Sequence, residues 1–97
     1  MKYNVILAPE AVDDFKRLSA GERSKIREAI EIHLRHEPAK ISKSRIKRLR
    51  GMSRPEYRLR VDEFRVFYDI KKNEIEILAI VPKTKASEWL ERYGEKA

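Results

Sequence analysis

The chain has 97 residues, of which 23 are basic, 16 are acidic and none is cysteine. This length fits one small domain with a single core, and the lack of cysteine excludes disulfides and thiolate metal sites and suits a reducing compartment. The apolar start of the chain is much shorter than a signal-peptide core or a membrane span, so we expect a cytoplasmic protein that makes no membrane contact.

The net charge of +7 is concentrated in one part of the chain. Residues 1–39 carry seven basic and seven acidic side chains and residues 66–97 carry six of each, whereas residues 40–65 carry ten basic against three acidic ones. A localised positive field attracts polyanions, and nucleic acid is the commonest of them. If the basic residues served only to keep the protein soluble, the excess positive charge would be distributed along the whole chain.

The first forty residues predict a strand and two helices. Residues 2–7 alternate as in a half-buried strand, and Pro9 opens a helix at a position where its missing N–H costs nothing. Residues 19–21 interrupt that helix. A second helix is expected over about residues 22–35, where large aliphatic side chains recur every four residues, and Pro38 ends it. The buried stripe of this helix consists of Ile26, Ile30 and Leu34.

Residues 39–51 have many basic side chains and little apolar periodicity. We expect a connecting loop here, with at most a short turn of helix, that is anchored to the core by Leu49. In a protein that binds RNA, such exposed cations would contact the phosphate backbone. The candidate RNA-binding residues of this loop are Lys43, Arg45, Lys47, Arg48 and Arg50.

Residues 57–68 alternate apolar and charged side chains on both sides of residues 62–63. This pattern predicts a hairpin of two antiparallel strands, each half-buried. The expected register places Arg60 opposite Arg65, Arg58 opposite Phe67 and Leu59 opposite Val66.

Three arginine side chains, Arg58, Arg60 and Arg65, then share one face of the hairpin, because side chains on a strand alternate with period two. Like charges directly opposite one another destabilise a sheet, so this arrangement makes sense if an anion binds to it. The alternative interpretation is that the arginines only solvate the open face of a sheet, flanked by Asp69 and Glu76.

The rest of the chain predicts a third strand and a last helix. Residues 75–81 are apolar on both faces, which favours an interior strand, and Pro82 ends it. Residues 86–93 form a short amphipathic pattern that Gly94 stops. The order β-α-α-β-β-β-α indicates one α+β domain over residues 1–97, an antiparallel sheet with a helix pair on one face and an open basic face.

The residue types available restrict the chemistry of a possible active site. His33 and His36 are the only histidines, and no carboxylate cluster has metal-ligand spacing, so we expect no metal and no cofactor. RNA cleavage by the RNA's own 2′-hydroxyl needs neither. It requires the nucleotide to be held in line for attack and the extra negative charge on the phosphorane to be stabilised, which clustered arginines can do.

Two lysines and two aromatic residues complete the candidate site. Arginine stays protonated up to about pH 12 and is a poor general base, so Lys83 or Lys85, at the end of the interior strand, are candidates for proton transfer. Phe67 and Trp89 are candidate surfaces on which a base could stack. For Trp89 the alternative is a core position, in which the helix packs on the sheet.

Several of these segments together resemble the RelE/ParE superfamily of bacterial and archaeal toxins. They are Arg48-Leu49-Arg50-Gly51, Tyr57-Arg58-Leu59-Arg60-Val61, Phe64-Arg65-Val66-Phe67-Tyr68-Asp69-Ile70 and Ile75-Glu76-Ile77-Leu78-Ala79-Ile80. The resemblance covers nearly the whole chain. It implies a single RelE-like domain that acts as a ribosome-dependent endoribonuclease and cuts messenger RNA in the A site by metal-independent 2′-hydroxyl attack.

The resemblance also implies roles for particular residues. The basic residues of the first hairpin strand of RelE fall on Arg58 and Arg60, where RelE has lysines, and its phosphate-binding arginine falls on Arg65. The basic residue after its last strand falls near the lysines at positions 83 and 85. The place of its C-terminal tyrosine is roughly that of Trp89, with Tyr93 one turn further on.

Partners follow from the resemblance as well. We expect a cognate antitoxin that is acidic and partly disordered when free, and that either covers the arginines or displaces the C-terminal helix. The ribosome and its messenger RNA are the expected targets, and operator DNA is contacted only through the antitoxin. Two alternatives stay open, namely a ParE-like inhibitor of DNA gyrase without nuclease activity and a non-catalytic nucleic-acid-binding module.

Overall fold

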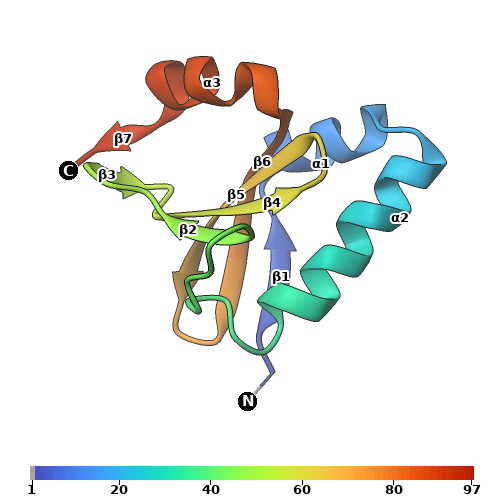
Figure 1. Ribbon diagram of the computed structural model, residues 1–97, viewed down its shortest axis with the longest axis horizontal. Helices are drawn as coiled ribbons and strands as arrows, with labels where there is room; N and C mark the ends of the chain where they lie inside the picture. The colour runs from blue at the N-terminus through green and yellow to red at the C-terminus, as the bar shows by residue number, and fades with distance from the viewer. Residues whose placement is uncertain (1) are drawn as a thin grey trace.

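The computed structural model describes residues 2–97 and shows an α+β fold, in which a twisted sheet separates a helix pair from a single helix (Figure 1). The strands are β1 (Asn4–Leu7), β2 (Ile46–Arg48), β3 (Met52–Arg54), β4 (Tyr57–Val61), β5 (Phe64–Lys71), β6 (Glu74–Pro82) and β7 (Glu95–Lys96). The helical segments are α1 (Pro9–Arg17), α2 (Ala20–Ala29), its π-helical continuation η1 (Ile30–Leu34), the 3₁₀ turn η2 (Lys83–Lys85) and α3 (Ala86–Tyr93).

The main sheet has the strand order β1-β6-β5-β4-β2. The hairpin β4–β5 has the predicted register, with Arg60 opposite Arg65 and Arg58 opposite Phe67. Strand β6 is interior, as its apolar sequence indicates. The expectation of an antiparallel sheet is correct except for β1, which pairs with β6 in parallel.

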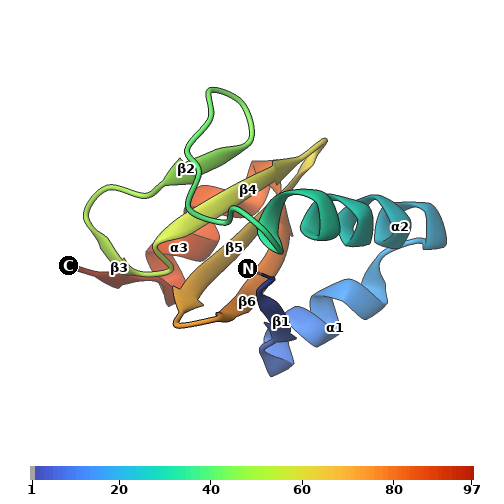
Figure 2. The same ribbon diagram turned by 90° about the horizontal axis from the view of Figure 1, so that it is seen from below.

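The helix pair lies on one face of the sheet, and Figure 2 shows α1 and α2 together on the side away from α3. The break between them is shorter than predicted. Ser19 is the N-cap of α2, because its hydroxyl accepts from the backbone N–H of Glu22 while the Glu22 carboxylate accepts from the N–H of Ser19. Gly21 therefore lies inside the helix.

The main core lies between the helix pair and the sheet. The predicted stripe is confirmed, because Ile26, Ile30 and Leu34 are all buried against the apolar face of the hairpin. Tyr68 is buried in the same core, and its hydroxyl donates to the carbonyl of Pro38 at 2.6 Å. Burial raises the pKa of this phenol far above its ordinary value. The hydrogen bond ties the end of the helix pair to the centre of the sheet.

The prediction of a loop over residues 39–51 is wrong in part, because the segment contains the edge strand β2. Ile46 of β2 is 4 % exposed and anchors the segment in the main core. Leu49, the predicted anchor, is only partly buried and packs on the opposite face of the sheet, near Phe67. A strand of three residues is too short to show a period of two in a sequence dominated by charge.

The end of the chain forms a second, two-stranded sheet in which β7 pairs with β3. The Ser53 hydroxyl donates to the carbonyl of Glu95 at 3.1 Å, and the N–H of Ala97 donates to the carbonyl of Gly51 at 2.9 Å. This pairing fastens α3, whose predicted limits are confirmed, above the open face of the main sheet. Among residues 2–97, no helix has the length and apolar character needed to cross a membrane.

Candidate functional site

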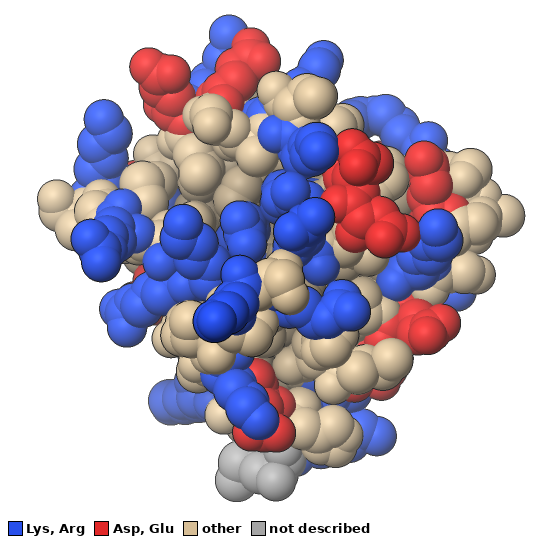
Figure 3. All heavy atoms as spheres, in the orientation of Figure 1, with Lys and Arg blue, Asp and Glu red and all other residues tan. Residues whose placement is uncertain are grey.

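The arginines of the hairpin form one patch on the face of the sheet opposite the helix pair. Arg58 and Arg60 project from β4, and Arg65 projects from β5 directly opposite Arg60. Lys47 of the edge strand β2 lies opposite Arg58 and extends the patch by one strand. Figure 3 shows lysine and arginine side chains across the middle of the face that carries β2 and β4. We call Lys47, Arg58, Arg60 and Arg65 the arginine patch.

The arginines of this patch form no ion pair with a carboxylate of the described residues. Among residues 2–97, none of the ion pairs involves Arg58, Arg60 or Arg65. Burial lowers the pKa of Arg58, and the positive charges of Arg65 and Arg60 lower it further. Burial also lowers the pKa of Arg65, with a contribution from Arg60 that the negative charge of Glu63 opposes. An anion bound here would relieve this repulsion.

The carboxylates that were expected to flank the arginines have other partners. Glu76 lies 3.4 Å from Arg54 and 3.1 Å from Lys71, and the buried Asp69 accepts from the backbone N–H of Glu56 at 2.6 Å. The interpretation in which flanking acids merely balance the arginine patch is therefore not supported by these contacts.

Two guanidinium groups of the patch differ in their hydrogen bonding. Arg65 Nη1 donates to the backbone carbonyls of Asp62 at 3.0 Å and Phe64 at 2.9 Å, which holds the side chain at the hairpin turn. Nε of Arg58 is buried and has no hydrogen-bond partner. A buried donor without an acceptor is costly, so Arg58 is the less favourably held of the two guanidinium groups.

The two candidate lysines lie in the 3₁₀ turn that follows β6. The N–H of Lys83 donates to the carbonyl of Glu63 at 2.7 Å, and its Nζ lies 3.6 Å from the Glu63 carboxylate. Lys85 lines a hollow of about 190 Å³ together with Val81, Trp89 and Arg92. Since Val81 is the neighbour of Arg65 across β5 and β6, Lys85 is brought to the side of the patch where Arg65 lies.

The basic residues before the hairpin do not all join the patch. All of them are exposed, but only Lys47 shares the face of the arginines. Arg48 lies on the other face, where its guanidinium carbon is 5.7 Å from the centre of the Tyr57 ring and its Nη2 is 2.9 Å from Glu56. Lys43 precedes β2 and Arg50 lies in the turn to β3.

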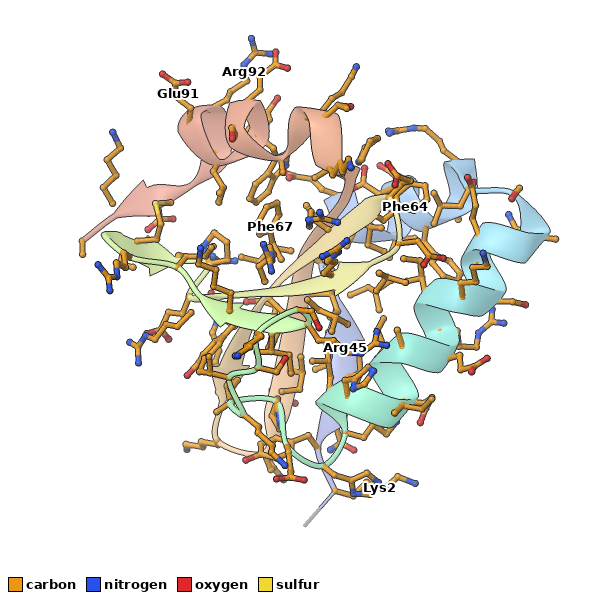
Figure 4. All side chains as sticks on the ribbon, in the orientation of Figure 1. Lys2, Arg45, Phe64, Phe67, Glu91 and Arg92 are labelled. Carbon is orange, nitrogen blue, oxygen red and sulfur yellow. The ribbon has the colours of Figure 1, made fainter. Side chains whose placement is uncertain are left out.

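The side chain of Arg45 lies near the end of α2 and η1 in Figure 4, although its carbonyl accepts from the backbone N–H of Arg60 at 2.8 Å. It lines a hollow of about 330 Å³ that His33 lines as well. The pKa of His33 is lowered by burial and by the positive charge of Arg45. Within residues 2–97, no three His, Asp or Glu side chains are grouped so that they could hold a metal ion.

The expectation that Phe67 stacks on an RNA base does not fit its position. Phe67 is 1 % exposed and lies under α3, where its ring is parallel to that of Trp89 with 5.0 Å between the centroids (Figure 4). Trp89 is itself only partly buried, so of these two rings it is the one that remains accessible. Phe67 therefore supports Trp89 instead of meeting a ligand. Trp89 packs on the sheet through this stack, and stacking of an RNA base on its exposed part stays a prediction.

Arg92 was missed in the sequence, although it lines the same hollow as Lys85 and Trp89. The sequence does place Arg92 three residues after Trp89 on an amphipathic helix, and this spacing indicates that the two side chains are neighbours. A larger hollow on the other side of Trp89 had no such signal, because its side chains come from several separate elements.

Comparison with known proteins places these features in a family. Residues 5–86 match the family described as ParE toxin of type II toxin-antitoxin system, parDE. The fold is similar to a chain of the archaeal RelE-RelB complex from Pyrococcus horikoshii OT3, with 27 % identity, a TM-score of 0.69, and coverage of 86 % of this chain and 97 % of that one. No curated protein matches the chain.

Two more distant likenesses show the fold alone. A chain of the RelBE2 toxin-antitoxin complex from Mycobacterium tuberculosis is 21 % identical, with a TM-score of 0.67, over 84 % of this chain and 99 % of that one. A chain of the YoeB-YefM complex from Staphylococcus aureus is 22 % identical, with a TM-score of 0.61, over 82 % of this chain and 95 % of that one.

Proposed function

Because the chain belongs to the ParE toxins of type II toxin-antitoxin systems, we propose that this toxin is a ribosome-dependent endoribonuclease of the RelE type, which cuts messenger RNA in the A site. The observation that carries the proposal is the arginine patch, whose cations lie side by side without carboxylate partners. Cleavage by the 2′-hydroxyl of the RNA itself requires that concentration of positive charge and no bound metal.

Each arginine has a proposed role in this reaction. Arg65, held by two backbone carbonyls, binds the scissile phosphate. Arg58 is half-buried and takes part in none of the ion pairs among residues 2–97, so its guanidinium group would donate to a phosphate oxygen in the trigonal-bipyramidal transition state. Arg60, directly opposite Arg65, adds to the field that stabilises the extra negative charge.

Proton transfer is assigned to the lysines of the 3₁₀ turn. Lys83 is engaged by the Glu63 carboxylate at 3.6 Å, whereas Lys85 lines the hollow beside Trp89 and is the better placed of the two. The exposed part of the Trp89 ring would stack on a base of the codon and so help to hold the nucleotide in line for attack.

The remaining basic residues fit a large anionic target. Lys47 extends the arginine patch. Four further basic side chains lie outside the face that carries the patch, and a messenger RNA bound to that face would not reach all four. We assign to ribosomal RNA the four that lie outside, which are Lys43, Arg45, Arg48 and Arg50. Such a target places the protein in the cytoplasm.

A cognate antitoxin is the proposed inhibitor. The similar solved structures include complexes of RelE with RelB and of YoeB with YefM. An acidic antitoxin segment would be attracted to the arginine patch and would exclude RNA from it. Contact with operator DNA would be made through the antitoxin.

A second candidate function follows from the family model, which is that of ParE. Members of the superfamily that resemble ParE poison DNA gyrase and do not cut RNA. In that case the arginine patch would be a binding surface only, as it would be in a plain nucleic-acid-binding module.

The deciding experiment adds the purified protein to translating ribosomes with a defined message and maps the new 5′ ends by primer extension. Replacement Arg65→Ala should reduce cleavage in the A-site codon by about 10²–10³-fold, the usual loss of one transition-state donor. The matched control is Arg17→Ala, which removes an arginine from α1 whose side chain is 74 % exposed. Both variants should still bind the antitoxin.

Intact message together with arrested DNA supercoiling by gyrase would contradict the proposal and favour the ParE-like function. Full cleavage by the Arg65→Ala variant would show that the assigned site is wrong.

A further inference from the structure

A second hollow of about 480 Å³ lies on the open face of the sheet, on the other side of Trp89 from Lys85. Its lining comes from the start of α1, the β3–β4 connection, β6, α3 and β7. We call it the acidic hollow, and its polar and aromatic lining residues are Glu10, Arg54, Glu76, Trp89, Tyr93 and Glu95.

The charge of this hollow is opposite to that of the rest of the open face. Three carboxylates face one arginine, and Arg54 is already engaged by Glu76 at 3.4 Å and by the buried Asp69 at 3.9 Å. Glu10 and Glu95 take part in none of the ion pairs among the described residues. In a chain with a net charge of +7, this is a place where a cation would be attracted and a phosphate repelled.

Two aromatic side chains add a second means of binding a cation. Trp89 and Tyr93 are one helical turn apart, their ring centroids are 5.8 Å apart, and their planes are tilted by 45°. Tyr93 is 56 % exposed, so its ring is available to a partner. An ammonium or guanidinium group over such a ring is attracted by its negative face.

The walls of the hollow are held in place before any ligand binds. The Trp89 ring is stacked on Phe67, and β7, which carries Glu95, is hydrogen-bonded to β3. Gly94 packs so closely against Met52 and the carbonyl of Leu90 that a Cβ would collide with both. A pre-organised site loses less entropy on binding than a flexible one.

We propose that the acidic hollow binds the guanidinium or ammonium group of a basic side chain that the antitoxin presents. The proposed binding of a basic side chain rests on the proposed antitoxin partnership and adds one specific contact to it. The acidic residues of the antitoxin would meet the arginine patch, and one basic residue would meet the hollow, which fixes the register of the segment. RNA has no cationic group to offer here, so the contact also discriminates the antitoxin from the substrate.

The test uses a small probe and the natural chain. Nα-acetyl-arginine N-methylamide is titrated into the protein while the indole N–H of Trp89, the sole tryptophan, is followed by NMR. A saturable shift is expected that weakens at high salt. The double variant Glu10→Gln/Glu95→Gln should bind the probe about five-fold less tightly, the usual scale of exposed ion pairs.

The matched control is Glu74→Gln/Glu91→Gln, which changes the net charge equally at exposed positions outside the hollow; Glu91 lies on the outer side of α3 in Figure 4. This control should bind the probe as the natural chain does. If it weakens binding as much as the first variant, or if acetyl-norleucine N-methylamide binds equally well, the proposal is wrong. Displacement of the arginine probe by adenosine or cytidine would make the hollow a base site and also overturn the proposal.

The outcome can be separated from that of the nuclease assay. The variant Glu10→Gln/Glu95→Gln should cleave messenger RNA normally, and Arg65→Ala should bind the arginine probe normally. Loss of cleavage in the first variant would assign the hollow to the substrate and contradict the proposal. Absence of cleavage by the natural chain would remove the nuclease function and leave the probe result standing.

Discussion

The stack of Phe67 on Trp89 is the contact that decides how the open face is built, and a double-mutant cycle measures it directly. Replacing each residue by leucine removes one ring but keeps part of the apolar volume, so no large cavity forms. The two rings lie 5.0 Å apart and within 9° of parallel, and Phe67 is 1 % exposed. Their coupling should therefore be visible in the free energy of unfolding.

The expected magnitudes follow from these contacts. Phe67→Leu should cost about 1–2 kcal/mol because the ring is fully buried, and Trp89→Leu about 1 kcal/mol because its ring is partly exposed. The double variant should lose less than the sum of the two by about 0.5–1.5 kcal/mol, the usual contribution of an aromatic pair beyond its buried area. Domains of this size have a total stability of about 5–15 kcal/mol, so all variants should remain folded.

Urea unfolding followed by far-ultraviolet circular dichroism gives the four free energies, since Trp89→Leu removes the only tryptophan. Additivity within about 0.3 kcal/mol would refute the reasoning, because independent sites behave in that way. The stack would then contribute nothing to stability beyond the area that each ring buries.

Three further predictions concern the scaffold. Tyr68→Phe should cost about 1–3 kcal/mol in the free energy of unfolding, because the buried carbonyl of Pro38 loses the donor that lies 2.6 Å away; chemical denaturation measures it. Asp14→Ala should destabilise by about 1–3 kcal/mol, because the N–H of Ile80 donates to that carboxylate at 2.9 Å, and faster amide exchange at Ile80 is the specific sign. Burial raises the pKa of Asp69, so between the ordinary and the raised pKa the folded state binds a proton that the unfolded state lacks, and stability should fall as pH rises through that window. Unfolding measured from pH 4 to pH 7 should show this slope in the natural chain and lose it in Asp69→Asn.

The hairpin shows what local pattern alone can predict. The alternation on both sides of the turn implies the register, and the register implies that Arg58, Arg60 and Arg65 share a face; the structure confirms the pairing. The paired residues of a hairpin are close together in the chain, so the sequence of a short segment is enough to predict which of them are opposite one another. The same holds for the limits of α3, which depend on amphipathic spacing and on Gly94.

Contacts between distant parts of the chain could not be predicted in this way. Strand β7 is defined by its partner β3, more than forty residues earlier. Strand β2 is nearer to its partner β4, but it is too short to show a pattern of its own. The burial of Phe67 depends on α3 arriving over it from the end of the chain. The pattern placed Phe67 on the arginine face, which is correct, but only the tertiary structure decided that another ring covers it.

The sequence by itself thus determined the fold class, the helix pair, the hairpin and the position of the arginine patch, because each follows from periodicity within a short segment. The tertiary structure alone decided which of the basic residues join that patch, that Arg65 is held by its own turn while Arg58 lacks an acceptor, and that an acidic hollow lies beside it. Those features arise where separate elements meet, and the meeting of elements depends on packing that no single segment encodes.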